Sequence, residues 1–379
     1  MAIVKENAAP NVVVGAATGQ HLCNYDSSIS NDILTSNNGT GKSSMKEISM
    51  TELYDQVYEP RKPIVEGLLY PGTYIFAGAP KVGKSFYMAQ LAYHVAAGLP
   101  LWDYAVRQGT VLYLALEDDY ARLQKRLSRM FDLEGVDNLY LVTDARAMAD
   151  GLEIQMEQFI TLHSDTVLII IDTLQRIRDL GSEQYSYSKD YEVIKRLKEF
   201  GDNHGICLLI VHHTRKMEAE DSFDMISGTN GLLGAADGAF VLKKKKRTDL
   251  TATLSIVGRD QQDQELSLKF DQEKCCWNYV SAETEPWKIP PDPVLEAISR
   301  LFSDSTGGYE GSASMLLEDL KKTDPDISIT ANALGRKLNI CADRLLNEYG
   351  IRYESTRTHS GRCIRLSKVM QTEETEKKD

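Results

Sequence analysis

An apolar run, a glycine-rich loop and a helical pattern follow one another near residue 80, and this order constrains the fold more than any other feature of the chain. Residues 72–78 predict a buried strand and residues 85–97 a helix. Because the residues between them fit G-x-x-x-x-G-K-[ST], a phosphate loop is indicated, formed by Gly78, Ala79, Pro80, Lys81, Val82, Gly83, Lys84 and Ser85. We expect Lys84 to reach the β- and γ-phosphates of ATP and Ser85 to coordinate Mg²⁺. The alternative is a glycine-rich turn that arose by chance.

Further apolar runs alternate with helical patterns along the chain. Strands are predicted at residues 111–116, 139–142, 166–171 and 206–211, with helices at 120–130 and 191–204. This alternation is typical of an α/β fold in which helices cover both faces of a mostly parallel sheet. After Gly238 the chain predicts only strands, at residues 239–242, 251–257, 265–270 and 276–280. We expect these to form antiparallel hairpins at the end of the same domain.

The length of 379 residues and the changes in composition divide the chain into five segments. We expect a flexible polar tail at 1–47, the nucleotide-binding domain at 48–284, a Pro-rich linker at 285–292, a small domain at 293–368 and a charged tail at 369–379. In the small domain, helical patterns at 294–302, 312–322 and 331–349 precede strand-like pieces at 351–355 and 362–366. This order predicts a winged-helix-like domain.

Charge and cysteine content exclude several classes of protein. The chain has 43 Lys and Arg against 55 Asp and Glu, a net charge of −12, so a uniformly basic nucleic-acid coat is excluded. No apolar run approaches the ~18 residues of a membrane span, and no secretion signal is recognisable. The six cysteines form no C-x-x-C pair, which favours a reducing compartment. We expect a cytoplasmic protein without a membrane partner.

Carboxylates follow two of the predicted strands. Asp172 ends the run 167–171, where it can hold Mg²⁺ directly or through water; the alternative is the N-cap of a helix. Glu117 follows the strand 111–116, where it can polarise the water that attacks the γ-phosphate. Asp118 and Asp119 are adjacent, so the spacing leaves the choice among the three acids open. An acidic helix start is the alternative for Asp118 or Asp119.

Three other groups carry a candidate function together with a structural alternative. His212 and His213 follow the strand 206–211, where one of them can sense the γ-phosphate; the alternative is a pair of structural histidines. Arg259 ends a late strand and can reach the nucleotide of a neighbouring subunit, or it can pair with Asp260 at the surface. The basic run 243–247, which includes Lys244, can contact nucleic-acid phosphates or form a solvated turn.

In the order of these motifs the chain resembles RecA-like ATPases, and more narrowly the plasmid RepA-type hexameric replicative helicases and their relatives on phages and conjugative elements. The resemblance covers residues 60–281 and rests on Gly78–Ser85, Glu117-Asp118, Ile171-Asp172, His212-His213 and Gly258-Arg259. It implies an ATP-driven ring motor on single-stranded DNA, a homo-oligomer, here expected as a hexamer, with nucleotide sites between subunits. In this family Glu117 matches the catalytic base and Asp172 the Mg²⁺-associated acid. Arg259 falls where related ring helicases carry an arginine that acts on the neighbouring site.

The resemblance also implies that two loops, residues 174–189 and 215–228, face the central channel of the ring. They carry the basic residues Arg176, Arg178, Arg215 and Lys216, and also the acids Glu218, Glu220, Asp221 and Asp224. A second DNA-contacting surface is expected in the small domain, where residues 335–368 hold eight basic and three acidic residues. Arg357 and Arg362 near the predicted wing are its candidates, and a protein-docking appendage is the alternative.

Two other functions are compatible with these motifs. One is a regulatory or loader ATPase, a nucleotide-switched binding module that leaves duplexes intact. The other is a DNA-binding replication initiator in which ATP only drives assembly. Initiator or primase proteins of the same element are candidate partners in each case.

Overall fold

The computed structural model describes residues 47–178, 187–214, 222–226, 230–259, 261–283, 290–303, 308–358 and 361–369. The chain divides into two compact units, Met1–Leu53 and Tyr54–Asp379. The described part of the first unit begins helix α1 (Met50–Tyr54). Ser49 and Glu52 form a capping box there, because each accepts a hydrogen bond from the backbone N–H of the other at 2.9 and 3.2 Å.

A nine-stranded sheet in the order β3-β2-β4-β5-β1-β6-β7-β8-β9 forms the centre of the second unit. The first six strands in this order run parallel: β3 (Leu139–Val142), β2 (Thr110–Ala115), β4 (Thr166–Asp172), β5 (Cys207–His213), β1 (Gly72–Gly78) and β6 (Gly238–Lys243). The last three pair antiparallel: β7 (Thr251–Gly258), β8 (Gln264–Asp271) and β9 (Cys276–Ala282). The predicted fold class is confirmed: the sheet has the RecA-like P-loop arrangement, with antiparallel strands at its end.

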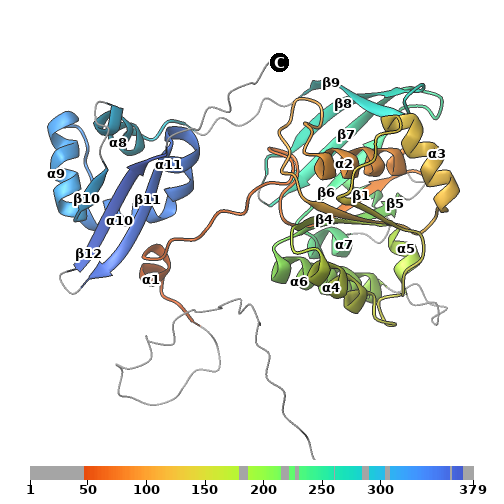
Figure 1. Ribbon diagram of the computed structural model, residues 1–379, viewed down its shortest axis with the longest axis horizontal. Helices are drawn as coiled ribbons and strands as arrows, with labels where there is room; N and C mark the ends of the chain where they lie inside the picture. Colours follow the sequence, from red (N-terminus) through yellow and green to blue (C-terminus); the bar gives the residue numbers. More distant parts are fainter. Residues whose placement is uncertain are drawn as a thin grey trace, which may run out of the picture. The chain divides into compact units, whose positions relative to one another are not determined.

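Helices cover both faces of this sheet (Figure 1). Helices α2 (Lys84–Ala97) and α3 (Tyr120–Phe131) pack on one face, and α4 (Leu152–Leu162), α6 (Tyr187–His204) and α7 (Asn230–Ala235) on the other. Successive residues of a strand point to opposite faces, so one strand contributes to both cores. Tyr74 and Phe76 of β1 lie in the core with α2, whereas Ile75 and Ala77 lie in the other. This two-sided burial explains why the central strands are continuously apolar.

Residues 290–369 contain a second set of elements with its own core. These are α8 (Pro293–Ser303), β10 (Tyr309–Gly311), α9 (Ala313–Thr323), α10 (Ala331–Ile340), α11 (Ala342–Tyr349), β11 (Ile351–Thr358) and β12 (Gly361–Lys368). The strands form an antiparallel sheet in the order β10-β12-β11. Apolar side chains from every helix and from β11 and β12 form one buried cluster that includes Leu295, Leu320, Leu334, Leu345 and Ile364.

Several predicted boundaries differ from the structure. Strand β5 continues to His213 and does not end at Val211, because its pairing with β1 extends to Gly78. The helix expected over 331–349 is broken at Cys341, which has φ −104° and ψ 19°. Strand β10 was not predicted, since three residues give no periodic signal. Among the described residues, no helix combines the length and apolar character that a membrane crossing requires.

Candidate nucleotide site

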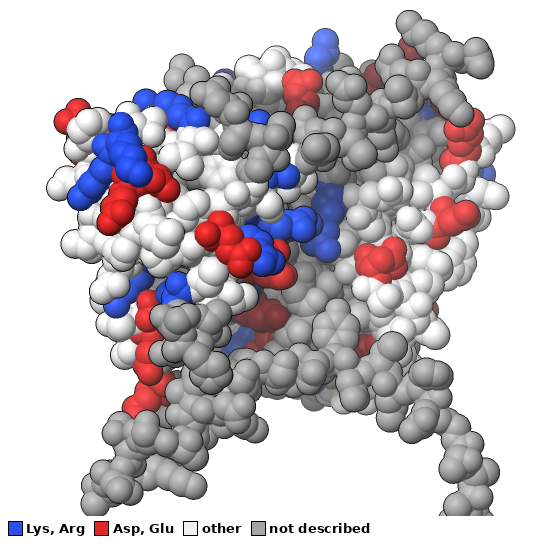
Figure 2. All heavy atoms as spheres, turned by 60° about the vertical axis from the view of Figure 1, so that its left-hand side comes forward, with Lys and Arg blue, Asp and Glu red and all other residues white. Residues whose placement is uncertain are grey.

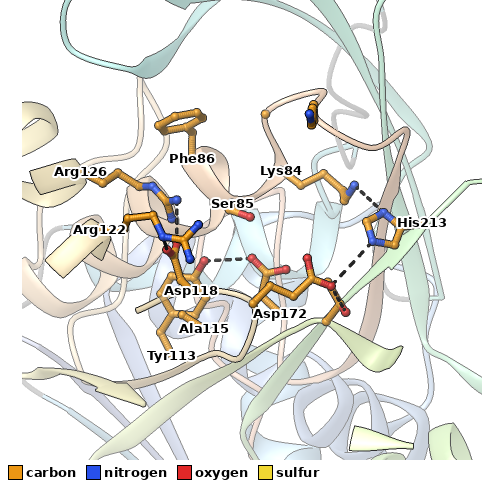
Figure 3. A pocket seen from close by; sticks show the side chains of 14 residues that line it. Lys84, Ser85, Phe86, Tyr113, Ala115, Asp118, Arg122, Arg126, Asp172 and His213 are labelled. Carbon is orange, nitrogen blue, oxygen red and sulfur yellow. Dashed lines mark hydrogen bonds and ion pairs between the residues drawn. The ribbon is translucent and has the colours of Figure 1, made fainter. Parts of the chain in front are cut away.

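The carboxyl ends of the parallel strands bring the predicted catalytic residues together. Because β1, β2, β4 and β5 run in the same direction, the residues that follow them meet at one edge of the sheet. A cavity of about 410 Å³ lies there (Figure 3), lined by Lys81, Gly83, Lys84, Ser85, Phe86, Tyr113, Ala115, Glu117, Asp118, Arg122, Arg126, Asp172, Thr173 and His213. The phosphate loop, both predicted carboxylates and His213 therefore share one site.

The phosphate loop is closed around the side chain of its own lysine. Lys84 Nζ donates hydrogen bonds to the carbonyl oxygens of Gly78 (2.8 Å) and Ala79 (3.1 Å), and also contacts His213 Nδ1 at 3.2 Å. Burial lowers the pKa of Lys84 to about 8, although Asp172 and Glu117 oppose this shift. A phosphate group is the natural partner for an ammonium group in this position.

The turn from the loop into α2 depends on Gly83 and on an aromatic ring from β9. Gly83 has φ +110°, and a Cβ atom there would lie 2.8 Å from the ring of Trp277. Trp277 Nε1 donates a hydrogen bond to the Gly83 carbonyl at 3.2 Å. Gln90 of α2 fixes Trp277 further, since its side chain bonds both the backbone N–H and the carbonyl of Trp277, at 2.8 and 3.0 Å. Strand β9 thus supports the phosphate loop from behind.

The three adjacent acids after β2 have different environments, which the sequence could not distinguish. Asp119 is the N-cap of α3 and accepts from the backbone N–H of Arg122 at 2.9 Å. Asp118 pairs with Arg126 at 2.6 Å and with Arg122 at 3.3 Å. Glu117 keeps half of its side chain exposed, at 50%. The helix-start alternative therefore holds for Asp119, and Glu117 remains available to a reactant.

Two groups orient the Glu117 carboxylate within the cavity. Thr173 Oγ1 donates to Glu117 Oε1 at 3.0 Å, and His213 Nε2 lies 4.0 Å from the same oxygen. Lys84 donates to Nδ1 of His213, so a neutral imidazole carries its proton on Nε2, toward Glu117. Burial, followed by the charge of Lys84, lowers the pKa of His213. The neutral form of His213 is consequently favoured near neutral pH.

Asp172 lies at the tip of β4, where burial raises the pKa of its carboxyl group. The hydroxyl of Tyr113 donates to Asp172 Oδ2 at 3.0 Å, and the Ser85 hydroxyl also bonds to this carboxylate. The two residues predicted to hold Mg²⁺, Ser85 and Asp172, are therefore in contact. A buried carboxylate whose charged form is disfavoured gains from a neighbouring divalent cation.

The donor set fits Mg²⁺ only if the nucleotide supplies further oxygens. Among the residues that the structure describes, no group of three or more His, Cys, Asp or Glu side chains can hold a metal ion. Ser85 and Asp172 offer one hydroxyl and one carboxylate. Mg²⁺ is commonly bound by one or two such protein groups together with phosphates and water, which agrees with this pair.

The two histidines separate as expected for neighbours on an extended strand. His212 is buried, at 6% exposure, and does not belong to the described residues that line the cavity, whereas His213 does. Of the two, the structure brings His213 to Lys84 and Glu117. The sequence alone left this choice open.

Arg259 lies just after β7, and it is not among the described residues that line the cavity of its own chain. Its side chain is 61% exposed, and Nη1 lies 3.8 Å from Asp237 Oδ1. The expected alternative partner, Asp260, lies outside the described residues. Asp237 also accepts from Lys198 and from the backbone N–H of Thr73, so Arg259 is only one of its partners.

The predicted nucleic-acid contacts have varied surroundings. Arg176 is exposed on α5 (Leu174–Ile177), whereas Arg215 and Lys216 lie outside the described residues. Lys244 follows β6, and its ammonium lies 5.2 Å from the ring centre of Trp277 and 5.6 Å from that of Phe270. The other residues of the basic run 243–247 are exposed between β6 and β7, as predicted.

Sequence reasoning missed several residues that shape the site. Tyr113 reaches Asp172 from the middle of β2, and Arg126 of α3 contacts both Asp118 and the face of Phe86, at 5.2 Å from the ring centre. Trp277 is almost 200 residues from the loop that it supports. The carboxyl-end rule finds residues after strands, but it gives no signal for side chains that reach the site from a strand interior or from a distant hairpin.

The strand order and the phosphate loop together define the class: residues 72–282 form a RecA-like P-loop ATPase domain. In agreement, residues 42–219 match the family model described as "AAA domain". Curated relatives are also detected. "DNA repair protein RadA" of Streptococcus pyogenes serotype M6 is 28% identical over 156 residues, which is 40% of this chain and 30% of RadA. The corresponding protein of Streptococcus pneumoniae is 25% identical over 40% of this chain and 33% of its own length. The chain thus spans about a third of the relatives that it matches.

Comparison with solved structures gives remote similarities. A structure titled as an isolated ATPase domain has a TM-score of 0.47 at 14% identity, covering 56% of this chain and 85% of that one. A DnaB-like replicative helicase, in a structure titled for its interactions with primase, has a TM-score of 0.46 at 14% identity, covering 56% and 58%. A KaiC-like protein of Pyrococcus horikoshii OT3 has a TM-score of 0.42 at 14% identity, covering 60% and 99%. The fold assignment rests on the strand order and the phosphate loop themselves.

Proposed function

We propose that this chain is an ATP-driven RecA-fold motor acting on single-stranded DNA, a helicase or translocase in the replication of a plasmid, phage or conjugative element. One observation carries the ATPase part: Lys84, Asp172, Glu117 and His213, from four segments of the chain, line one cavity. A site that only binds nucleotide needs the phosphate loop. The oriented carboxylate of Glu117 is what hydrolysis requires in addition.

Each residue of the cavity has a distinct role in this proposal. Lys84 binds the β- and γ-phosphates and gives up His213 as its partner when they arrive. Glu117, held by Thr173, accepts a proton from the attacking water. Ser85 and Asp172 hold Mg²⁺, which would neutralise charge on the phosphates. His213 contacts the γ-phosphate and senses its loss.

The assembly is proposed as a homo-oligomer, a ring of six subunits. Arg259 lies away from its own cavity and is mostly exposed, which suits an arginine that completes the site of a neighbouring subunit. Single-stranded DNA would pass the loops that carry Arg176, Arg215 and Lys216. The relatives named for DNA repair support a DNA-associated role, although they share only part of their length with this chain. A cytoplasmic location agrees with such a motor.

The domain boundaries proposed from composition are compatible with these elements. The ATPase domain would occupy residues 48–284 and the winged-helix-like domain residues 293–368, joined by the linker 285–292. The segments 1–47 and 369–379 would be polar tails. Arg357 and Arg362, opposite each other in the β11–β12 register, belong to the proposed second DNA surface.

The ATPase rate tests this proposal, measured with and without single-stranded DNA at low salt over a range of protein concentrations. A motor with shared sites gives stimulation by DNA and a steep dependence on protein concentration. Lys84→Ala abolishes turnover, whereas Lys125→Ala, which removes an exposed lysine of α3, leaves it unchanged. Turnover that ignores both DNA and protein concentration contradicts the motor.

A loader or initiator ATPase is the second candidate, and the basic surface of the C-terminal domain favours it. A forked DNA duplex separates the two functions. A helicase releases the displaced strand during ATP hydrolysis, whereas a loader or initiator hydrolyses ATP and leaves the fork intact. Initiator or primase proteins of the same element would then be its partners.

A further inference from the structure

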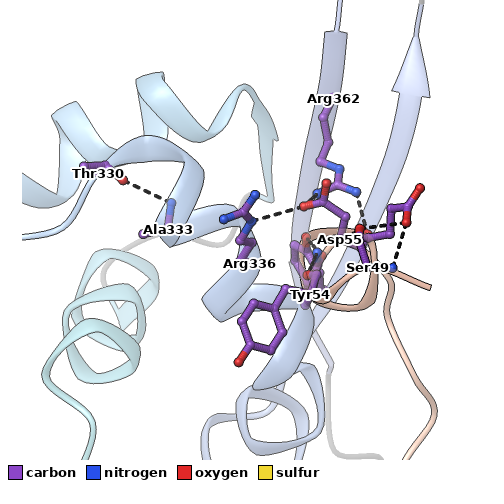
Figure 4. Close-up of polar contacts among 10 residues, drawn as sticks. Ser49, Tyr54, Asp55, Thr330, Ala333, Arg336 and Arg362 are labelled. Carbon is purple, nitrogen blue, oxygen red and sulfur yellow. Dashed lines mark hydrogen bonds and ion pairs between the residues drawn. The ribbon is translucent and has the colours of Figure 1, made fainter. Parts of the chain in front are cut away.

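Two residues that precede the ATPase sheet in the sequence contact the C-terminal domain (Figure 4). The Tyr54 carbonyl accepts a hydrogen bond from Asn339 Nδ2 at 2.9 Å. Asp55 Oδ1 lies 3.4 Å from Arg336 Nε and 3.4 Å from Arg362 Nη1. The Asp55 carbonyl accepts a further hydrogen bond from Arg362 Nη2 at 2.6 Å. One carboxylate and two carbonyls thus face donors that lie about 280 to 310 residues further along the chain.

The donor set on the C-terminal domain is built into its fold. Asn339 is 2% exposed, and the hydroxyl of Tyr353 donates to its Oδ1 at 2.7 Å. This bond turns Nδ2 of Asn339 outward, toward an acceptor. Arg336 belongs to α10, the helix that follows the turn after α9, and Arg362 to the hairpin strand β12. Helix and hairpin therefore present donors to one acceptor group.

Other charged side chains of this domain find partners within residues 290–369. Arg344 pairs with Glu348 at 2.8 Å, Lys337 with Asp292 at 2.7 Å, and Arg365 with Glu310 at 2.9 Å. Figure 2 shows the same mixture, with basic and acidic side chains in adjacent groups on the visible face. Arg336 and Arg362 differ, because the carboxylate between them comes from outside the domain.

The contact has the chemistry of a phosphate site that is held by a weak substitute. Two guanidinium groups and an amide N–H suit a phosphate, which offers more oxygens and more charge than one carboxylate. Arg336, Arg362 and Asp55 are 37%, 36% and 44% exposed, and the two ion pairs are long. Exposed pairs of this kind contribute little, so another anion can displace Asp55.

We propose that Tyr54 and Asp55 form an autoinhibitory contact on a surface of the C-terminal domain that binds the phosphate backbone of duplex DNA. Duplex DNA is the expected ligand because a helix after a turn and a neighbouring hairpin present the donors together, as in winged-helix recognition. DNA and residues 54–55 compete for Arg336, Arg362 and Asn339. This proposal rests on the DNA-associated role proposed above, but it requires neither ATP hydrolysis nor unwinding.

Fluorescence anisotropy of the full chain with a labelled duplex of mixed sequence tests the competition. Asp55→Ala removes the competing carboxylate, and we expect duplex affinity to rise about three- to tenfold at low salt. Glu59→Gln removes one negative charge from a nearby exposed position, so it corrects for the change in net charge. Arg362→Gln in the Asp55→Ala background is expected to reverse the gain. Thermal unfolding checks that each variant is folded.

Several outcomes would overturn the proposal. Equal affinities of Asp55→Ala and Glu59→Gln would show a general charge effect. A gain that survives Arg362→Gln would place the DNA elsewhere, and absence of duplex binding by every variant would exclude a DNA surface here. Single-strand-stimulated ATPase, measured on the same proteins, reports separately on the proposed motor.

Discussion

His213 Nδ1 accepts a hydrogen bond from the Lys84 ammonium at 3.2 Å, so the tip of β5 holds the phosphate-loop lysine. Two carbonyls of the loop share the same ammonium. A phosphate that enters the loop must replace some of these partners, and His213 is the one that belongs to a different strand. Nucleotide binding is therefore linked to the position of His213, and through its Nε2 to Glu117.

The pKa of Lys84 predicts a pH dependence of nucleotide binding. Burial lowers this pKa to about 8 in the free protein, and bound phosphate raises it because the charged form gains a partner. Binding therefore takes up a proton above the pKa of the free protein. We expect ADP affinity to be constant below this pKa and to fall about tenfold per pH unit above it.

A fluorescent ADP analogue titrated from about pH 7 to about pH 9.5 measures this dependence. Lys84→Arg is the matched control, because a guanidinium stays charged over this range and its residual binding should change little with pH. Equal slopes for wild type and Lys84→Arg would show that another group titrates.

Glu117 and Asp118 are expected to respond differently to the loss of one charge. Glu117→Gln keeps the hydrogen bond from Thr173 but removes the base, so kcat should fall at least about a hundredfold with little change in ATP affinity. Asp118→Asn weakens the partly buried pair with Arg126, so the free energy of unfolding should fall by about 1–3 kcal/mol. Single-turnover hydrolysis and thermal unfolding of both variants distinguish chemistry from stability. If Asp118→Asn is the variant that loses turnover while remaining stable, the base has been assigned to the wrong residue.

Gly83 is expected to tolerate alanine poorly because of the ring behind it. Gly83→Ala must adopt φ +110° and would bring Cβ to 2.8 Å from Trp277. Gly205→Ala is the matched control: Gly205 has φ +62°, and nothing lies within 4 Å of a Cβ there. Gly205→Ala should cost about 1–2 kcal/mol of stability from the backbone alone, without loss of nucleotide affinity. Gly83→Ala should lower ADP affinity at least about tenfold in addition, and equal affinities would mean that Trp277 yields without moving the loop.

The sequence predicted those parts of the site that follow from strand direction. Lys84, Glu117, Asp172 and His213 each come at or just after the end of a parallel strand, and the structure gathers them at one edge. Asp118 and Asp119 show the limit of this reasoning. Adjacent acids have the same local pattern, and only the position of Arg126 on α3 determines which one is paired.

Long-range packing explains what the sequence did not predict. Trp277 supports Gly83 because the antiparallel hairpins return β9 to α2, which no local period encodes. The contact of Asp55 with Arg336 and Arg362 likewise joins distant segments by charge. The basic excess of residues 335–368 was visible in the sequence, but not that an acid from the other end of the chain lies on it.

Arg259 provides the sharpest test of a site shared between subunits. It is exposed and does not line the cavity of its own chain, so Arg259→Ala should leave ADP affinity intact and lower turnover about 10³-fold or more. Lys84→Ala is inactive for a different reason, because its own phosphate loop fails. A mixture of the two variants creates sites that combine Lys84 of one subunit with Arg259 of the next, so part of the activity should return. Lys198→Ala, which removes another partner of Asp237, controls for disturbance of this carboxylate. If the mixture stays inactive although the variants co-assemble, Arg259 does not act on a neighbouring site.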